Sequence, residues 1–244
     1  MMNNENFVSV IVPTFNEKDN IVPLIEAIHK ELSFCRHQIV VVDDNSADGT
    51  YRIVCDKKYD FVKPVLRTSD PSLAKSIRAG LEVADGDIFV VMDSDFNHQP
   101  SYIPRMVKNL EYYDCVSASR FVYGGRMDSR KRHILSWIFN IFVRLVTNKF
   151  VTDSLYGFYA IHRSAAKKLD YDKIFWGYGD YCIRLMYYLQ EINADILQIP
   201  AVNGQRLKGD GNSRFWGVFC QYSRETIGLV VRERFKIKFQ GNKH

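Results

Sequence analysis

Three apolar segments early in the chain have the character of β-strands, and each one ends in acidic or amide side chains. They span residues 7–13, 38–42 and 88–92. The groups that follow them are Asn16 and Glu17, Asp43 and Asp44, and Asp93 and Asp95. Because the carboxyl ends of parallel strands meet at one edge of an open sheet, this pattern predicts a parallel sheet with a ligand crevice at that edge.

Strand and helix patterns alternate from residue 7 to about residue 118. Strands are predicted at 7–13, 38–43, 62–67, 87–93 and 114–119, and helices at 20–33, 48–57, 72–83 and 100–112. This alternation is typical of a mostly parallel, Rossmann-like α/β sheet flanked by helices. The rest of the chain predicts a polar loop, an amphipathic helix, a strand, a helix, a strand and a last helix, at 120–133, 134–148, 155–162, 177–189, 195–203 and 214–233. With no repeat or linker, we expect a single domain over residues 1–244.

The carboxylates of Asp93 and Asp95 form the most informative pair. Residues two apart on a strand face the same side, so both side chains can point at one ligand. Two carboxylates held that close repel unless a cation or hydrogen-bond donors lie between them. Mg²⁺ or Mn²⁺ is the cation that such hard oxygen ligands favour. The alternative for an isolated Asp-Ser-Asp is a solvated turn.

Three motifs together resemble a known family. They are the segments 10–17 (VIVPTFNE), 41–50 (VVDDNSADGT) and 92–95 (MDSD). Their order and spacing resemble the N-terminal signatures of family 2 glycosyltransferases with the GT-A fold. Within that family, segment 43–50 and segment 119–125 (SRFVYGG) look most like dolichyl-phosphate or polyprenyl-phosphate mannosyltransferases. The resemblance implies an inverting, metal-dependent transfer of a hexose onto a polyprenyl or dolichyl phosphate, with mannose from GDP-mannose as the donor and UDP-glucose or another UDP-hexose as the alternative.

In the family, the first half of the domain (7–119) binds the nucleotide diphosphate sugar and the second half (120–233) builds the acceptor site. The resemblance places Pro13, Thr14, Glu17 and Asp44 around the base and ribose, and Arg206 over the diphosphate. We expect Asp95 to be the direct metal ligand, with Asp93 nearer the ribose or the water shell of the metal. Carboxylates suit the first role because they accept hydrogen bonds from base N–H groups and ribose hydroxyls. For Thr14 simple turn chemistry is an equal alternative.

On the acceptor side, the resemblance assigns Arg120, Arg132 and Ser136 to the lipid phosphate. The planar guanidinium of arginine suits a phosphate, and a helix N-terminus adds a favourable dipole. The sequence departs from the subfamily at Tyr156, which stands where a small residue is expected in segment 153–158.

Segment 177–185 (GYGDYCIRL) resembles the motif by which many family 2 enzymes place a general base, and Asp180 keeps the second of its two acids. A sugar hydroxyl needs such a base, whereas a phosphate is already an anion. The basic and aromatic region 120–146 favours the phosphate acceptor. The alternatives are transfer to a glycan hydroxyl in surface polysaccharide synthesis, with Asp180 as base, and a catalytically silent nucleotide-sugar-binding or scaffold subunit. Asp180 could equally cap a helix.

Charge and cysteine content limit the setting. The net charge is +5, with basic clusters in 126–144 and 232–243 that suit phosphates or anionic lipids. No RNA-binding signature accompanies them, so we expect no nucleic-acid partner. Five scattered cysteines and no signal peptide indicate a reducing, cytoplasmic compartment.

No segment of the sequence approaches the ~20 apolar residues of a membrane span. Helix 134–148 fits either an interfacial helix on a lipid surface or a core helix. We therefore expect peripheral association with the cytoplasmic face of a membrane, through this helix, the basic tail or a membrane-anchoring partner protein.

Overall fold

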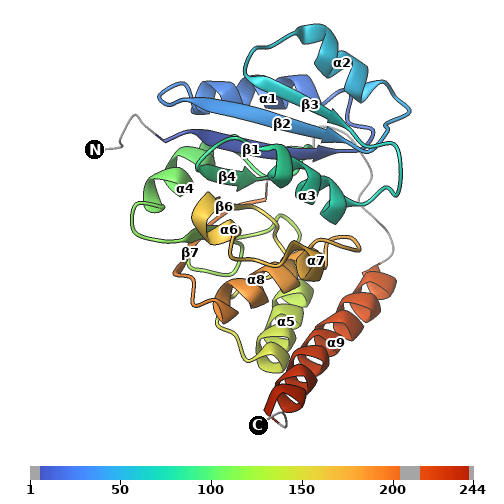
Figure 1. Ribbon diagram of the computed structural model, residues 1–244, viewed down its shortest axis with the longest axis vertical. Coiled ribbons are helices and arrows are strands. Elements are labelled where there is room, and N and C mark those ends of the chain that lie inside the picture. The colour runs from blue at the N-terminus through green and yellow to red at the C-terminus, as the bar shows by residue number, and fades with distance from the viewer. Residues whose placement is uncertain (1–5, 204–214, 242–244) are drawn as a thin grey trace.

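A seven-stranded mixed sheet is the centre of the computed structural model, which describes residues 6–203 and 215–241 (Figure 1). Its order is β3-β2-β1-β4-β6-β5-β7. The strands are β1 (Val8–Thr14), β2 (His37–Asp43), β3 (Val62–Leu66), β4 (Ile88–Val91), β5 (Cys115–Ser119), β6 (Tyr159–His162) and β7 (Ile196–Pro200). Of these described strands, β6 alone runs antiparallel to its neighbours. The mostly parallel sheet predicted from the sequence is confirmed.

Helices cover both faces of this sheet, because its central strands are apolar on both sides. One face packs on α1 (Ile21–Glu31), α2 (Thr50–Lys57), the short 3₁₀ turn η1 (Pro100–Tyr102) and α4 (Ile103–Asn109). The other face packs on α3 (Leu73–Val83), α6 (Arg163–Ala166), α7 (Tyr171–Ile174) and α8 (Tyr181–Glu191). The four-residue helices α6 and α7 were missed in the sequence because they are too short to show a helical period.

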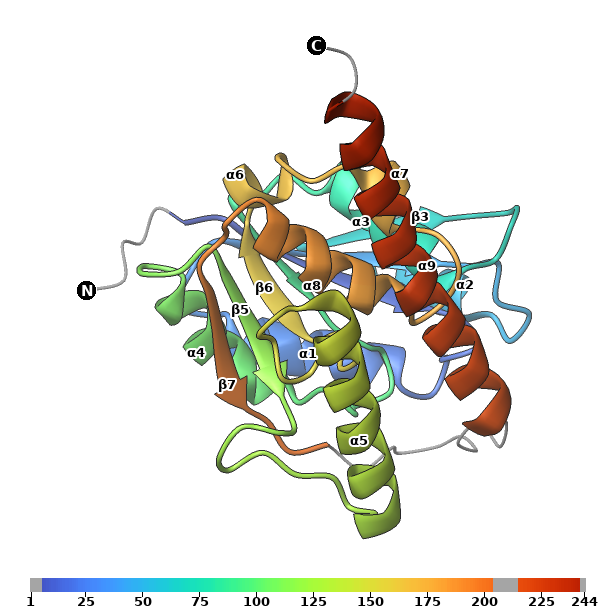
Figure 2. The ribbon, with the colours of Figure 1, turned by 90° about the horizontal axis from the view of Figure 1, so that it is seen from below.

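A third apolar cluster joins α8 to two long helices, α5 (Arg130–Thr147) and α9 (Phe215–Gly241). Figures 1 and 2 show α5 and α9 side by side at the end of the molecule away from β2 and β3. Phe139 of α5 and Phe219 of α9 lie with their ring centroids 5.0 Å apart. The second half of the chain therefore has its own small core beside the sheet.

The predicted amphipathic helix begins earlier than expected. It starts at Arg130 instead of residue 134, because the Ser129 side chain caps it and accepts a hydrogen bond from the Arg132 N–H at 3.4 Å. Arg132 consequently lies in the first turn of the helix, and Ser136 lies about one turn further on.

Candidate functional site

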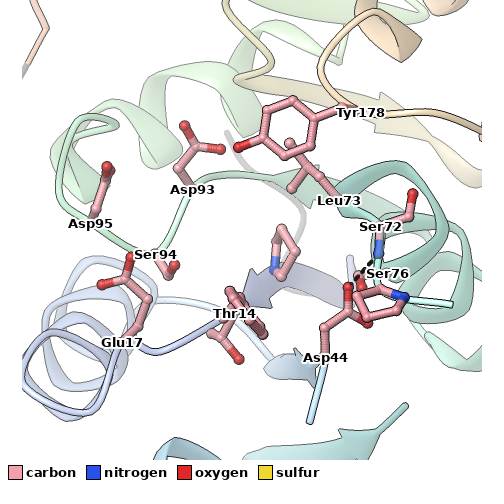
Figure 3. A pocket seen from close by; sticks show the side chains of 13 residues that line it. Thr14, Glu17, Asp44, Ser72, Leu73, Ser76, Asp93, Ser94, Asp95 and Tyr178 are labelled. Atoms are coloured by element: carbon pink, nitrogen blue, oxygen red, sulfur yellow. Dashed lines mark hydrogen bonds between the residues drawn. The ribbon is translucent and has the colours of Figure 1, made fainter. Parts of the chain in front are cut away.

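A cavity of about 440 Å³ opens at the carboxyl ends of β1, β2 and β4 (Figure 3). This is the edge at which the sequence predicts a ligand crevice. Residues from the β1 and β2 ends, from the start of α3, from the loop after β4 and from one later segment line it. They are Pro13, Thr14, Phe15, Glu17, Asp44, Pro71, Ser72, Leu73, Ser76, Asp93, Ser94, Asp95 and Tyr178. Six residues predicted for donor and metal binding are thus brought together.

The loops after β1 and β2 are clamped to each other by side-chain hydrogen bonds. The Thr14 hydroxyl donates to the fully buried Asp43 carboxylate at 2.9 Å, and the Ser46 N–H donates to the same carboxylate at 2.8 Å. The Ser46 hydroxyl in turn accepts from the Asn16 N–H at 2.8 Å. Asp43 therefore holds the loops in place, and Thr14 combines this turn role with a position on the cavity wall.

Asp44, one of the acidic side chains that line the cavity, has a partner that was not predicted. Arg67, directly after β3, forms an ion pair with the Asp44 carboxylate and also donates to the Ser76 hydroxyl at 2.9 Å. The Ser72 N–H donates to the same carboxylate at 2.8 Å, as Figure 3 marks. An arginine at the carboxyl end of a third parallel strand was the available clue.

Asp93 and Asp95 follow β4 and differ in exposure. The Asp93 side chain is 42% exposed, whereas Asp95 is 7% exposed. The Asp95 carboxylate accepts hydrogen bonds from the Asn97 N–H at 3.0 Å and from the Asn97 side-chain amide at 2.8 Å. The pair is therefore presented by a turn that Asn97 closes. This turn explains how the carboxylates keep a fixed direction beside the cavity.

His98 holds the same turn in place through a hydrogen bond to its backbone. Its Nδ1 accepts a hydrogen bond from the Asp93 N–H at 2.9 Å, so the proton of the neutral ring lies on Nε2. Nε2 is 3.6 Å from Asp93 Oδ2. The buried imidazole stacks on Phe158 with the ring centroids 4.9 Å apart. No role was predicted for His98, although it lies only three residues after Asp95.

Arg120 lies in a buried ion pair in the second half of the chain. Its Nε and Nη2 donate to the two oxygens of Asp153 at 2.8 Å each, and its backbone N–H donates to Asp153 at 3.0 Å. Tyr156 lies under the guanidinium, 4.9 Å from carbon to ring centroid, and donates its hydroxyl to the Asn97 carbonyl at 3.2 Å. Tyr156 thus connects Arg120 to the turn that carries Asp93 and Asp95.

Asp180 directly precedes α8, at its N-cap position, and is not among the described residues that line the cavity. Its carboxylate pairs with Arg184 and accepts from the Tyr178 N–H at 2.9 Å. The Asp180 backbone carbonyl accepts the Ile183 N–H of α8 at 3.1 Å, but the side chain makes none of its described hydrogen bonds to the helix N–H groups, so the alternative of a side-chain helix cap is not borne out. Arg184 also donates from Nε to the Ile174 carbonyl at 2.9 Å.

The remaining acceptor residues lie apart from this group. Arg132 is exposed and Ser136 is half-buried on α5, and neither belongs to the described lining of the cavity. Arg206 lies outside the described residues. The structure therefore assembles the predicted donor residues at one place, and the roles assigned to Arg120, Arg132, Ser136, Asp180 and Arg206 stay predictions.

Comparison with known proteins adds three observations. The family model described as glycosyl transferase family 2 matches residues 9–170. A dolichol-phosphate mannosyltransferase of Pyrococcus furiosus is 29% identical over 233 residues, which cover 93% of this chain and 64% of that protein. An undecaprenyl-phosphate mannosyltransferase of Micrococcus luteus is 27% identical over 244 residues, covering 91% of this chain and 99% of that one. This chain thus spans less than two thirds of the archaeal relative.

Among solved structures, glucosyl-3-phosphoglycerate synthase of Mycobacterium tuberculosis, in complex with Mn²⁺, UDP and phosphoglyceric acid, has a TM-score of 0.71 at 19% identity. The match covers 93% of this chain and 78% of that one. The same enzyme with Mg²⁺ and UDP has a TM-score of 0.70. This likeness confirms the predicted fold class.

Proposed function

Because the chain belongs to glycosyl transferase family 2 and is a glycosyltransferase, we propose that it moves a hexose from a nucleotide diphosphate sugar onto a polyprenyl phosphate. The observation that carries the proposal is the Asp93 and Asp95 pair at the mouth of a cavity large enough for a nucleotide. Mannose from GDP-mannose is the donor we propose, since two relatives are named as mannosyltransferases acting on dolichol phosphate and undecaprenyl phosphate.

The donor's base and ribose would occupy the part of the cavity formed by the β1 and β2 loops. Pro13, Thr14 and the exposed ring of Phe15 form an apolar wall there, and Glu17 and Asp44 supply acceptors for N–H and hydroxyl groups. Asp44 is held by Arg67 and Ser72, so it is oriented before any ligand arrives. Acceptors that are already held in position favour binding, because little side-chain conformational entropy is lost when the ligand binds.

The diphosphate would lie beside Asp93 and Asp95 together with Mg²⁺ or Mn²⁺. The donor set fits such a cation, since carboxylate oxygens are the ligands it prefers. The described part of the chain contains no cluster of three or more acidic, histidine or cysteine ligands. Phosphate oxygens of the donor would therefore complete the coordination, as is usual for Mg²⁺. When bound, the cation would stabilise the charge of the leaving diphosphate.

A phosphate acceptor agrees better with the surroundings of Asp180 than a hydroxyl acceptor does. A general base must reach the proton that it removes. Asp180 is buried, pairs with Arg184 and bonds to the Tyr178 backbone, so its oxygens already have partners within the protein. A polyprenyl phosphate is an anion at neutral pH and needs only positive charge to hold it. We propose Arg132 and Arg120 for this charge, the Ser136 hydroxyl as a further hydrogen-bond donor to the phosphate, and Arg206 over the donor.

We also propose that α5 lies on the cytoplasmic face of a membrane, where such a lipid would be found. One side of the helix packs into the protein through Phe139 and Val143. The helix nevertheless leaves large apolar residues exposed, namely Ile134, Leu135, Trp137, Ile138 and Leu145. Arg130, Lys131, Arg132 and Arg144 are exposed on the same helix. Such a combination of apolar and basic groups favours an anionic lipid surface. In the described residues, no helix is both long and apolar enough to cross a bilayer.

The proposal is tested by offering radiolabelled nucleotide sugars, Mn²⁺ and polyprenyl phosphate, and then extracting with butanol. Label in the organic phase supports transfer to the lipid. Label on a soluble glycan acceptor would instead support the polysaccharide alternative. No transfer from any donor by a folded protein would reject both activities and leave the silent binding subunit.

A further inference from the structure

The loop before α8 reaches across to the donor cavity and places one aromatic side chain there. Among the described residues that line the cavity, Tyr178 alone comes from the second half of the chain. Its side chain is 56% exposed, and Figure 3 shows the hydroxyl end pointing toward the Asp93 carboxylate. Every other lining residue comes from residues 13–95. Tyr178 is therefore the described contribution of the second half of the chain to the wall of the donor cavity.

This loop is tied to the donor half by a direct hydrogen bond. The Ser72 hydroxyl donates to the Gly177 carbonyl at 2.6 Å, and the Ser72 N–H donates to Asp44 at 2.8 Å. Gly177 has a φ of +74°, a conformation that residues with a Cβ rarely adopt. The same serine thus connects the loop that carries Tyr178 to the acidic group proposed for the nucleoside.

A second support lies behind the loop. The Tyr178 N–H donates to Asp180 at 2.9 Å, and Asp180 pairs with the buried Arg184. The Arg184 guanidinium lies 3.7 Å from the centroid of the Trp176 ring. The backbone on both sides of Tyr178 is consequently held by buried groups, although the side chain itself is exposed.

The third support comes from α9, whose Tyr222 lies against the loop. The Tyr222 hydroxyl lies against the Gly179 backbone, and a Cβ added at Gly179 would overlap that oxygen. Tyr222 is partly buried, and burial raises the pKa of its hydroxyl above the ordinary value. A loop fixed from three sides has a defined position before ligand binds, which is what substrate positioning requires.

We propose that Tyr178 contacts the hexose of the donor and contributes to the choice of sugar. This inference rests on the proposed function. The nucleoside would lie at the β1 and β2 loops and the diphosphate at Asp93 and Asp95, so the sugar extends toward the acceptor half, where the acceptor attacks. Tyr178 is the described lining residue from that half. A tyrosine offers an apolar ring to the C–H face of a sugar and a hydroxyl to its oxygens.

Equilibrium binding separates a sugar contact from a diphosphate contact. GDP-mannose, UDP-glucose, GDP and UDP are titrated with Mn²⁺ into the wild type and into Tyr178→Phe and Tyr178→Ala. We expect Tyr178→Ala to weaken nucleotide-sugar binding about tenfold, equivalent to about 1.4 kcal/mol, and to leave the nucleotides within about twofold. Tyr178→Phe should show a smaller loss that differs between the two sugars. Tyr112→Phe, an exposed tyrosine beyond α4, is the matched control.

Equal losses for the nucleotide sugar and its nucleotide would overturn the inference, as would unchanged binding of both. A wild type that is folded but binds no nucleotide sugar would overturn the proposed function as well. If the wild type and Tyr178→Ala bind the nucleotide sugar equally well, the inference about Tyr178 is overturned and the proposed function is not.

The role of Tyr222 as a positioning residue is tested by a pair of variants. Gly179→Ala should displace the loop and weaken nucleotide-sugar binding while leaving nucleotide binding unchanged. Adding Tyr222→Phe removes the overlapping oxygen, so the double variant should recover most of the lost affinity. If Gly179→Ala binds like the wild type, or if Tyr222→Phe brings no recovery, then α9 does not position Tyr178.

Discussion

The carboxylate of Asp180 pairs with the guanidinium of Arg184, and the two side chains are only 1% and 2% exposed. Arg184 follows Asp180 by one helical turn, so a single helix brings both groups into the core. Removing one partner of a buried ion pair lowers the free energy of unfolding more than removing one partner of an exposed pair, because the remaining buried charge is left without compensation. Asp180 thus has a structural role in addition to the general-base role that its motif suggests.

Asp180→Asn should separate this structural role from catalysis. We expect the variant to lose about 3–5 kcal/mol of unfolding free energy, because Arg184 keeps its charge in a buried site. Turnover per folded molecule should remain substantial if the acceptor is a phosphate. Denaturant unfolding and assays at a temperature where the variant is folded would measure the two effects. Glu191→Gln, which breaks the more exposed Lys149–Glu191 pair, is the control. A fall of about 10²–10⁴-fold in the rate of folded variant would indicate a base and a hydroxyl acceptor.

Asp95→Asn should abolish turnover. The substitution removes a negative charge where the cation of the diphosphate would bind. It also places an amide group against the two Asn97 N–H donors whose hydrogen bonds the Asp95 carboxylate accepts. Steady-state assays with saturating Mn²⁺ measure the effect, and Asp56→Asn on the exposed side of α2 serves as control. An Asp95→Asn rate above about a tenth of the wild-type rate, or ~1.4 kcal/mol in barrier, would remove Asp95 from the metal role.

Arg132→Ala should raise the KM for the lipid phosphate by about tenfold or more, since a hydrogen bond to a charged group contributes about 1.5–3 kcal/mol. The KM for the nucleotide sugar should change little, because Arg132 is exposed on the first turn of α5 and outside the described lining of the cavity. Arg52→Ala, an exposed arginine on α2, controls for the loss of surface charge. Equal changes in both KM values would indicate a general structural role.

Trp137→Asp combined with Ile138→Asp should reduce binding to liposomes that contain anionic lipid by about 100-fold or more. Both side chains are about half exposed, and burying each one in lipid is worth about 1.5–3 kcal/mol. Co-sedimentation measures the loss, and thermal unfolding should be unchanged. Phe142 is not a suitable anchor, because it packs against Phe139 with ring centroids 5.7 Å apart. Phe142→Asp should therefore destabilise the fold. Normal liposome binding by the double variant at Trp137 and Ile138 would contradict the membrane proposal.

The donor half was the more predictable part, since strand periodicity and the loops after β1, β2 and β4 are local features of the sequence. The contacts that complete the site join distant segments, as with Tyr156 and Asn97 or Ser72 and Gly177. Such pairs leave no pattern in a single sequence. One side of helix 134–148 packs into the protein, as the core interpretation predicted, and the packing of α8 and α9 decides which side that is. The interfacial interpretation of its exposed apolar residues stays a prediction. For Asp180, an arginine four residues later was a signal that could have been used.

The lipid product itself tests the central claim most directly. Wild-type protein and Asp95→Asn are each incubated with GDP-mannose, Mn²⁺ and polyprenyl phosphate, and the extracted lipid is analysed by mass spectrometry. We predict that the wild type gives a species with the mass of the acceptor plus one hexose residue, and that Asp95→Asn gives the unmodified lipid. Unmodified lipid from a wild-type protein that transfers the hexose to a glycan hydroxyl, or that transfers none, would contradict the account.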